Sequence, residues 1–174
     1  MRDGRRRAPW EGEAVSDDWE HRVERFWAEV DLDDREGALA GMRALVDERG
    51  VDDPVALAEW GGIHDSLGLE DEAVPLYREA LARGLDPERQ VRVTIQLAST
   101  LRNVGATDEA VELLAAAPDV PSLGGARRAF LALALHSVGR PDEALREALL
   151  ALADTLPRYQ RSVRGYADDL VEPS

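Results

Sequence analysis

The polar side chains that are best spaced to act together lie near the middle of the chain. They recur at intervals of four, three and four residues, so a helix would place them in one stripe. The stripe consists of Arg92, Gln96, Ser99 and Asn103, with Arg102 close by. Guanidinium and amide groups donate hydrogen bonds to carboxylates and to peptide carbonyls. The stripe therefore indicates either a solvated helix face or a surface that grips the backbone or a carboxylate of an extended peptide.

The residue types used in catalysis and metal binding are not arranged for either. His21, His64 and His136 are far apart and lack the spacing of a metal-ligating pair such as His-Glu-x-x-His. The absence of Cys removes thiolate ligands and disulfides. Gly61-Gly62 and Gly124-Gly125 lack the Lys and Ser/Thr of a phosphate-binding loop. We expect no enzyme activity, no catalytic residues, no metal site and no cofactor.

The composition favours an all-helical chain. The 174 residues are 44% hydrophobic but only 5% aromatic, and Ala and Leu supply most of the apolar side chains. This content suits close helix packing better than a β-sandwich, whose strands favour β-branched and aromatic residues. No stretch shows the sustained alternation of polar and apolar residues that is typical of a strand.

The charge balance limits the class of partner. The net charge is −14, from 35 acidic and 21 basic residues, and every basic residue is Arg, a bias typical of GC-rich coding. Nucleic-acid binding needs clustered cations, and the only basic cluster is Arg5–Arg7 at the end of the chain. No apolar run approaches the roughly 20 residues that span a bilayer. We expect a cytoplasmic protein with no nucleic-acid or membrane partner.

A repeated motif defines the elements that must position the polar stripe. The segments GLEDEAVPLYREAL, GATDEAVELLAAAP and GRPDEALREALLAL begin at Gly68, Gly105 and Gly139, which are 37 and 34 residues apart. A degraded fourth copy, DDREGALAGMRAL, places Ala38 35 residues before Ala73. A period of this length is typical of stacked helical hairpins. The glycine can take positive φ and end one helix, and Asp and Glu then suit the first turn of the next helix.

Proline and helix-capping residues predict where helices begin and end. Asp53-Pro54 and Asp86-Pro87 are typical of a helix start, with Pro in the first turn. Pro75 predicts a late start or a bend in its helix. Residues 1–15 are expected to form a flexible segment ahead of one domain spanning 16–171. The predicted helices cover about 18–30 and 34–48, 54–66 and 71–83, 87–103 and 108–117, 124–137 and 142–154, and 158–170.

The repeat resembles the tetratricopeptide repeat (TPR) superfamily, and within it a small bacterial protein. The copy WGGIHDSLGLEDEAVPLYREALARGLDP carries the family's small and aromatic positions, among them Gly61, Ala73, Tyr77 and Ala80. His64 stands where the family usually has Tyr. The resemblance implies a right-handed α-solenoid of about four hairpins. The first helix of each pair would line a concave groove, and a last helix would cap the exposed apolar end.

The implied groove would have sectors of different chemistry. Glu59 and Asp65 would form an acidic sector ahead of the polar stripe. Phe130, Leu133 and His136 would form an apolar sector, which either receives a ligand side chain or is covered by the C-terminal helix; we favour coverage. Such a mixed surface suits a peptide better than a small uniform ligand.

Aromatic residues concentrate near the N-terminus. Trp19 is predicted to face inward from the first helix, whereas Trp10 and Trp27 are predicted to be partly exposed. Exposed aromatic side chains often anchor partners, so this end could support self-association as a homodimer.

The sequence thus predicts a non-catalytic scaffold or adaptor that binds a protein or peptide in a concave groove. One alternative is a regulatory partner protein that senses a peptide or small ligand. The other is a homo-oligomeric assembly factor that uses the aromatic N-terminal end.

Overall fold

The computed structural model describes residues 10–172, with side chains from residue 18 onward, and within this range it contains α-helices and no strand. The nine α-helices confirm the all-helical prediction, and a 3-10 turn, Pro121–Leu123, precedes the seventh. The helices are α1 (Trp10–Glu29), α2 (Arg35–Arg49), α3 (Pro54–Ser66), α4 (Glu70–Arg83), α5 (Pro87–Asn103), α6 (Thr107–Ala116), α7 (Ala126–Ser137), α8 (Pro141–Ala153) and α9 (Gln160–Asp169).

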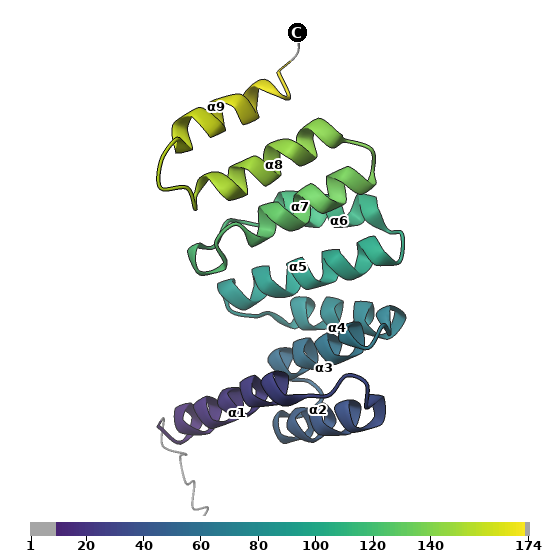
Figure 1. The fold of residues 1–174 in the computed structure, drawn as a ribbon. Helices are drawn as coiled ribbons and strands as arrows, with labels where there is room; N and C mark the ends of the chain where they lie inside the picture. Colours follow the sequence, from purple (N-terminus) through teal and green to yellow (C-terminus); the bar gives the residue numbers. More distant parts are fainter. Residues whose placement is uncertain (1–9, 173–174) are drawn as a thin grey trace, which may run out of the picture.

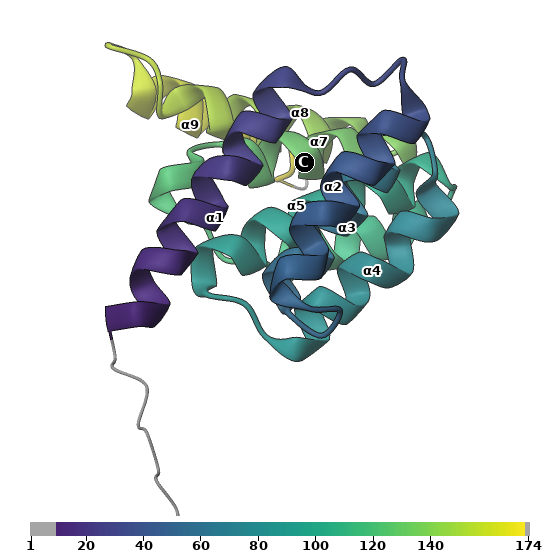
Figure 2. The same cartoon turned by 90° about the horizontal axis from the view of Figure 1, so that it is seen from below.

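The helices form hairpins that stack one above another (Figure 1). Each helix packs against the next in sequence, from α1 against α2 to α8 against α9. The helix α5 also packs against both α3 and α7, so the first helices of successive hairpins contact one another. Figure 2 views this stack from its N-terminal end. The arrangement confirms the predicted stack of TPR-like hairpins.

The three motif glycines occupy matching corners of consecutive hairpins. Gly68, Gly105 and Gly139 have φ values of +69°, +88° and +75° and lie between α3 and α4, α5 and α6, and α7 and α8. At each corner the amide after the glycine donates to the carbonyl five residues before that amide, over 2.8–3.0 Å. This bond is the signature of a glycine-terminated helix. The repeated motif is therefore a repeated turn, as its sequence predicts.

Aspartate caps begin two of the helices. The Asp53 carboxylate accepts hydrogen bonds from the amides of Val55 and Ala56 at the start of α3. Asp86 accepts from Glu88 and Arg89 at the start of α5. Each cap satisfies amides that the first helical turn leaves without a partner. The Asp-Pro prediction is confirmed at both positions.

The helix α1 differs most from its expected bounds, and the other helices agree with theirs to within two residues. The helix α1 begins at Trp10, ahead of the expected start near residue 18, and no Pro interrupts it. Residues 1–9 of the expected flexible segment lie outside the described residues. The helix α4 begins at Glu70 and runs through Pro75, so the expected late start is wrong. Pro75 is exposed, and water can hydrate the carbonyl that loses its amide partner there.

The core divides into two clusters that meet on α3. Leu57 and Ala58 of α3 belong to a large cluster that continues through α4 to α8. Ala56 and Ile63 of the same helix belong to a second cluster, which it shares with α1 and α2. The helix α3 therefore joins the first hairpin to the rest of the stack through two of its faces.

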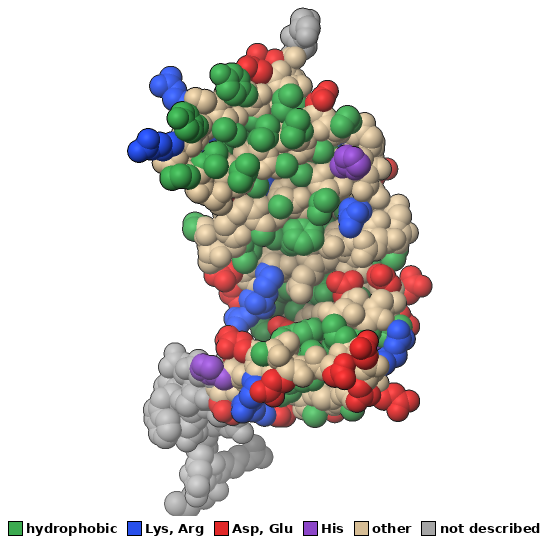
Figure 3. Space-filling model, viewed as in Figure 1, with side chains coloured by type: hydrophobic (Ala, Val, Ile, Leu, Met, Phe, Trp, Pro, Cys, Tyr) green, Lys and Arg blue, Asp and Glu red, His purple; other side chains and the backbone are tan. Residues whose placement is uncertain are grey.

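The last helix packs mainly on α8. Only Ala167 of α9 is buried, and Leu133 on α7 remains 51% exposed. The expectation that the C-terminal helix covers the Leu133 face of α7 is therefore wrong, because α9 continues the stack beyond α8. Figure 3 shows hydrophobic side chains gathered on the surface of this C-terminal end.

Candidate functional site: a groove between the first three hairpins

A groove of about 400 Å³ lies where the first hairpin meets the rest of the stack. Its walls are the first helices of three hairpins, α1, α3 and α5, and α4 contributes one side chain. Figure 3 shows the surface hollowed in this region, with acidic and Arg side chains beside the hollow. The lining residues are Val23, Glu24, Trp27, Glu59, Gly62, Asp65, Ser66, Tyr77, Arg92 and Gln96.

Gly62 allows α1 to close one side of the groove. A Cβ at this position would lie 3.2 Å from Cζ2 of Trp27, so the indole packs against bare backbone. The Trp27 Nε1–H group donates to Glu59 Oε2 over 2.7 Å. These two contacts fix the indole against α3 and hold the Glu59 carboxylate at the groove.

Gly61 performs the same role for the second aromatic residue of the groove. A Cβ at Gly61 would lie only 2.9 Å from Cδ1 and Cε1 of Tyr77, whose ring therefore packs directly on the α3 backbone. The Tyr77 side chain is fully buried, and its hydroxyl makes no hydrogen bond within 3.5 Å. Burial, and then the negative charges of Asp65 and Glu59, raise the pKa of this hydroxyl. The phenol thus stays protonated at neutral pH.

Asp65 lies at the inner end of the groove and is half-buried. The Thr100 hydroxyl of α5 lies 2.9 Å from Asp65 Oδ1 and also 2.9 Å from the Gln96 carbonyl oxygen. Because the hydroxyl has one proton, it donates to one of these two acceptors at a time. Burial raises the pKa of Asp65, and the charge of Glu70 adds to this effect. The hydrogen bond from Thr100 opposes it, and the nearby Tyr77 hydroxyl opposes it more weakly. The carboxylate is held in a place that disfavours its charge.

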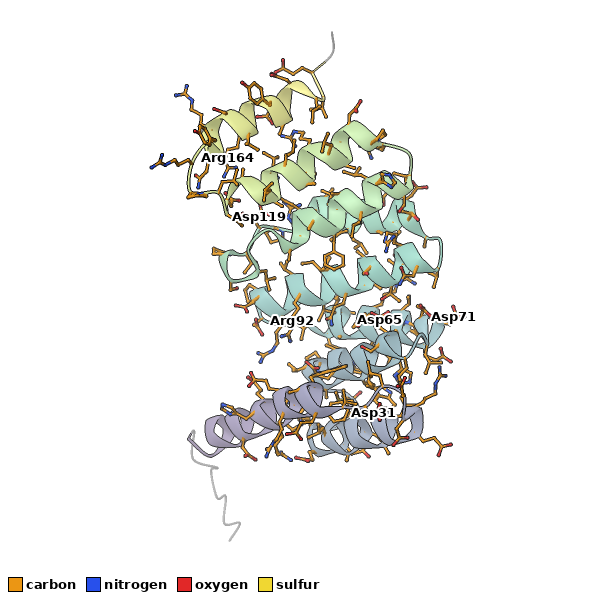
Figure 4. All side chains as sticks on the ribbon, in the orientation of Figure 1. Asp31, Asp65, Asp71, Arg92, Asp119 and Arg164 are labelled. Atoms are coloured by element: carbon orange, nitrogen blue, oxygen red, sulfur yellow. The ribbon has the colours of Figure 1, made fainter. Side chains whose placement is uncertain are left out.

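Arg92 crosses the mouth of the groove. It extends from α5 toward the first hairpin (Figure 4), and its Nη2 atom lies 3.6 Å from Glu59 Oε1. The guanidinium is half-exposed whereas Glu59 is mostly buried. Gln96, one turn along the same helix face, is also half-buried and lines the groove.

The structure brings together four of the ten residues predicted to line a groove and leaves the other six outside it. Glu59, Asp65, Arg92 and Gln96 line this groove. The remaining candidates lie on α5 and α7 beyond its lining: Ser99, Arg102, Asn103, Phe130, Leu133 and His136. Of these, Phe130 packs partly against the core, while Leu133 and His136 are exposed. The polar stripe of α5 is therefore continuous along the helix but enters the groove only at its N-terminal half.

The N-terminal aromatic residues have different environments. Trp19 is 3% exposed and donates its indole N–H to the Leu45 carbonyl over 2.8 Å. It is a core residue, as its predicted inward position requires, and is not available to a second copy of the chain. Trp27 is half-buried in the groove wall. Trp10 begins α1, but its side chain lies outside the described residues.

The sequence does not identify Trp27 or Tyr77 as residues that line the groove. The sequence pattern gives Tyr77 a repeat position and Trp27 a surface position. The usable signal is the adjacent pair Gly61-Gly62, since consecutive residues without side chains on one helix leave room for large neighbours on two sides.

The groove has the groups for recognition. Across the part of the chain from 18 to 172, no group of three His, Asp or Glu side chains is placed to hold a metal ion. Every helix in the described range is too short or too polar to span a bilayer. Carboxylates, an amide, a phenol and an indole around a cleft can together bind a polar side chain and pack against its apolar part.

Comparison with known proteins identifies the repeats. A family model described as Tetratrico peptide repeat matches residues 54–170, which leaves α1 and α2 outside the match. Among curated proteins, none matches the sequence.

Two solved structures have a similar fold. Both are of a Podosopora anserina protein described as a putative kinesin light chain with nearly identical TPR-like repeats, and one of them is a point-substituted variant of that protein. The variant structure superposes with a TM-score of 0.61 at 20% identity, covering 91% of this chain and 83% of the other. The second structure has a TM-score of 0.60 at 20% identity and covers 91% and 92%. At this identity the likeness concerns the fold alone.

Proposed function

The chain belongs to the tetratrico peptide repeat family, and from this premise we propose that it is a non-catalytic scaffold or adaptor that binds an extended peptide segment of a protein partner. Repeats of this family are in general protein-interaction scaffolds. The observation that carries the proposal is the groove itself, whose walls come from three consecutive hairpins. An extended peptide that lies across these hairpins can contact all three at once.

The polar side chains around the groove support a peptide as its ligand. Gln96 can donate to and accept from a peptide backbone, and Arg92 and Glu59 offer opposite charges at the mouth. The exposed residues Asn103, Leu133 and His136 extend this surface beyond the groove along α5 and α7. We include Ser99, Arg102 and Phe130 in the same proposed peptide path.

The proposal extends to the setting of the protein. The net charge of −14 disfavours a nucleic-acid partner and favours neutral or basic proteins. The use of Arg alone as the basic residue supports a GC-rich bacterial source, and we place the protein in the cytoplasm. Residues 16–171 are proposed to act as one domain, because α3 contributes to both core clusters.

Panning a random peptide library against the full chain tests the proposed function. Gln96→Trp fills the groove from a half-buried position, whereas Arg78→Trp places the same bulk on the exposed surface of α4. Enriched peptides are expected to bind the wild type and Arg78→Trp equally, and Gln96→Trp at least about tenfold more weakly. The proposal would be overturned if the library yields no binder, or if the enriched peptides bind Gln96→Trp as tightly as the wild type.

Self-association through the N-terminal aromatics remains a separate prediction. Trp19 is buried and cannot contribute, so the prediction now depends on Trp10 and Trp27. Sedimentation at increasing protein concentration tests it, and a monomer throughout would remove it. The regulatory alternative predicts that a small ligand copurifies with the protein, which native mass spectrometry would detect.

A further inference from the structure

We propose that the inner end of the groove is a pocket for a cationic side chain, Arg or Lys, of the peptide partner, held between Asp65, Tyr77 and Glu59. The inference rests on the proposed function, since it names the chemistry that the groove selects. Three features of the described residues support it: a half-buried carboxylate without a cationic partner, a buried hydroxyl with no hydrogen bond within 3.5 Å, and an Arg side chain that already occupies the mouth.

The first feature is the carboxylate of Asp65. It is half-buried, yet in the described part of the chain no cation forms an ion pair with it. Its hydrogen-bond donor is the neutral Thr100 hydroxyl, which is shared with the Gln96 carbonyl. A buried carboxylate is costly without a cation or several donors. A bound ammonium or guanidinium would supply both the charge and the additional donors.

The second feature is the hydroxyl of Tyr77. It is fully buried beside the groove and makes no hydrogen bond within 3.5 Å, although Asp65 is near enough to raise its pKa. A buried hydroxyl without a close hydrogen bond is unfavourable, because it has lost its hydration without a replacement. The phenol can accept a hydrogen bond from a cationic N–H group while its own proton turns toward Asp65. A cation with several donors is therefore the ligand that pairs both groups at once.

The third feature is Arg92, which shows that a guanidinium is accommodated at the mouth. Its Nη2 atom lies 3.6 Å from Glu59 Oε1, beyond hydrogen-bond distance, and the side chain is half-exposed. The pair is long and its Arg92 side is open to solvent, so it is weaker than a direct hydrogen-bonded ion pair. A ligand cation can therefore displace Arg92 from Glu59 at little cost. The other Glu59 oxygen stays engaged by Trp27, so the carboxylate keeps its position.

The surrounding charges favour a cation as well. Glu24 of α1 lines the groove and forms no ion pair with a described residue. Arg89, the other cation nearby, is already engaged by Glu20 at 2.6 Å and by Asp86 at 2.9 Å. The net charge of −14 adds a long-range attraction for basic ligands. The indole of Trp27 gives the apolar stem of an Arg or Lys side chain a surface to pack on.

A titration with two matched probes tests the inference directly. The probes are N-acetyl-arginine amide and N-acetyl-citrulline amide, which have nearly the same shape but differ in charge. The readout is the ¹H–¹⁵N signal of the Trp27 indole, identified by its loss in Trp27→Phe, because this group donates to Glu59 at the groove. The arginine probe is expected to shift this signal saturably, whereas citrulline at the same concentration leaves it in place.

Substitutions then assign the effect to the pocket. Asp65→Asn is expected to weaken binding of the arginine probe at least tenfold, and Tyr77→Phe several-fold. Asp71→Asn is the control and should leave binding unchanged, because Asp71 is exposed on α4 and does not line the groove. Gln96→Lys adds a competing cation from a half-buried position without changing a core residue. It is expected to abolish binding of the arginine probe, and this test holds even if Asp65→Asn disturbs folding.

Equal shifts with both probes, or undiminished binding of the arginine probe by Gln96→Lys, would overturn the inference. If groove-dependent peptides are enriched by panning but need no basic residue, the proposed function stands and only this inference fails.

Discussion

The hydroxyl of Thr100 lies 2.9 Å from the carboxylate of Asp65, and the two residues are 35 positions apart. That separation is close to one repeat, so the contact joins equivalent first helices of successive hairpins, α3 and α5. Thr100 is fully buried. This hydrogen bond between side chains of two repeats therefore lies in the groove wall, where it holds Asp65 in position.

Removing this hydrogen bond should lower the free energy of unfolding measurably. Thr100→Val keeps the shape of the side chain but leaves Asp65 without its hydroxyl donor, so we expect a loss of about 1–3 kcal/mol in the free energy of unfolding. Thr94→Val is the matched control, because its exposed hydroxyl donates only to the Gln90 carbonyl of its own helix. Urea denaturation should show a loss below about 0.5 kcal/mol for the control. Equal losses for both variants would contradict a stabilising role for the Thr100–Asp65 hydrogen bond.

Gly61 is required for the ring of Tyr77 to pack on α3. Gly61→Ala places a Cβ 2.9 Å from two ring atoms, and such overpacking costs about 1–3 kcal/mol. Gly165→Ala in α9 is the control, since no atom lies within 4 Å of its Cβ. The control should gain up to about 1 kcal/mol from helix propensity. Thermal unfolding distinguishes the two, and a Gly61→Ala variant as stable as the wild type would refute the packing argument.

The corner glycines are required for their backbone conformation and not for space. Gly105 has a φ of +88°, and nothing lies within 4 Å of a Cβ built there. We expect Gly105→Ala to lose about 1–2 kcal/mol through left-handed strain, and Gly105→Asn to lose less because Asn tolerates this region. Denaturant midpoints should fall in the order Gly, Asn, Ala. An Ala variant more stable than the Asn variant would count against this explanation.

Binding of a cationic probe should weaken as the pH falls through the raised pKa of Asp65. Burial raises this pKa above the ordinary value of 3.8. The folded protein therefore takes up this proton before the unfolded chain does, and the contribution of Asp65 to the free energy of unfolding falls as the pH rises through that window. Protonation removes the charge that the probe needs.

The neighbours of Asp65 determine how this titration is read. They are Glu59 on its own helix, Glu70 and Tyr77 on α4, Thr100 and Arg92 on α5, and Glu24 on α1. Affinity of the arginine probe, measured from about pH 7 down to about pH 4, should decline at a higher pH than the range typical of Asp. Asp65→Asn should remove that part of the decline. A pH-independent affinity in the wild type would exclude Asp65 as the binding charge.

Arg127 should matter for stability more than any exposed arginine pair. It is 9% exposed, donates to the Leu114 carbonyl over 2.9 Å and contacts Asp119. Arg127→Met leaves that carbonyl unpaired, and we expect a loss of about 1–3 kcal/mol. Arg78→Met breaks only an exposed pair with Glu109 and should cost less than about 1 kcal/mol. Chemical denaturation gives both values, and the reverse order would be inconsistent with the structure.

Local signals made the fold predictable from the sequence. The motif glycines, the Asp-Pro caps and the apolar spacing each depend on residues a few positions apart, so their consequences can be worked out without the tertiary structure. Pro75 shows the limit of such rules, because its effect depends on whether its side of the helix faces solvent. The position of α9 likewise depends on which neighbouring surface it meets.

The groove was only partly predictable for the same physical reason. Glu59, Asp65, Arg92 and Gln96 share helix faces that the repeat pattern reveals. The Trp27–Glu59 hydrogen bond joins residues 32 positions apart, and the Tyr77 ring reaches the groove from α4. Such contacts depend on how closely two helices approach, which here is set by Gly61 and Gly62. Spacing along one helix carries no information about that distance.

Site-specific photocrosslinking tests the central claim, that a partner peptide binds in the groove, most directly. A benzophenone amino acid replaces Ser66, an exposed residue that lines the groove, or, as the control, Arg78 on the exposed surface of α4, and each protein is irradiated in lysate of its native cells. We predict a peptide adduct from position 66 that mass spectrometry maps to a segment with Arg or Lys, that is absent from position 78 and that is lost in Asp65→Asn. Identical adducts from both positions, or none from position 66, would contradict the claim.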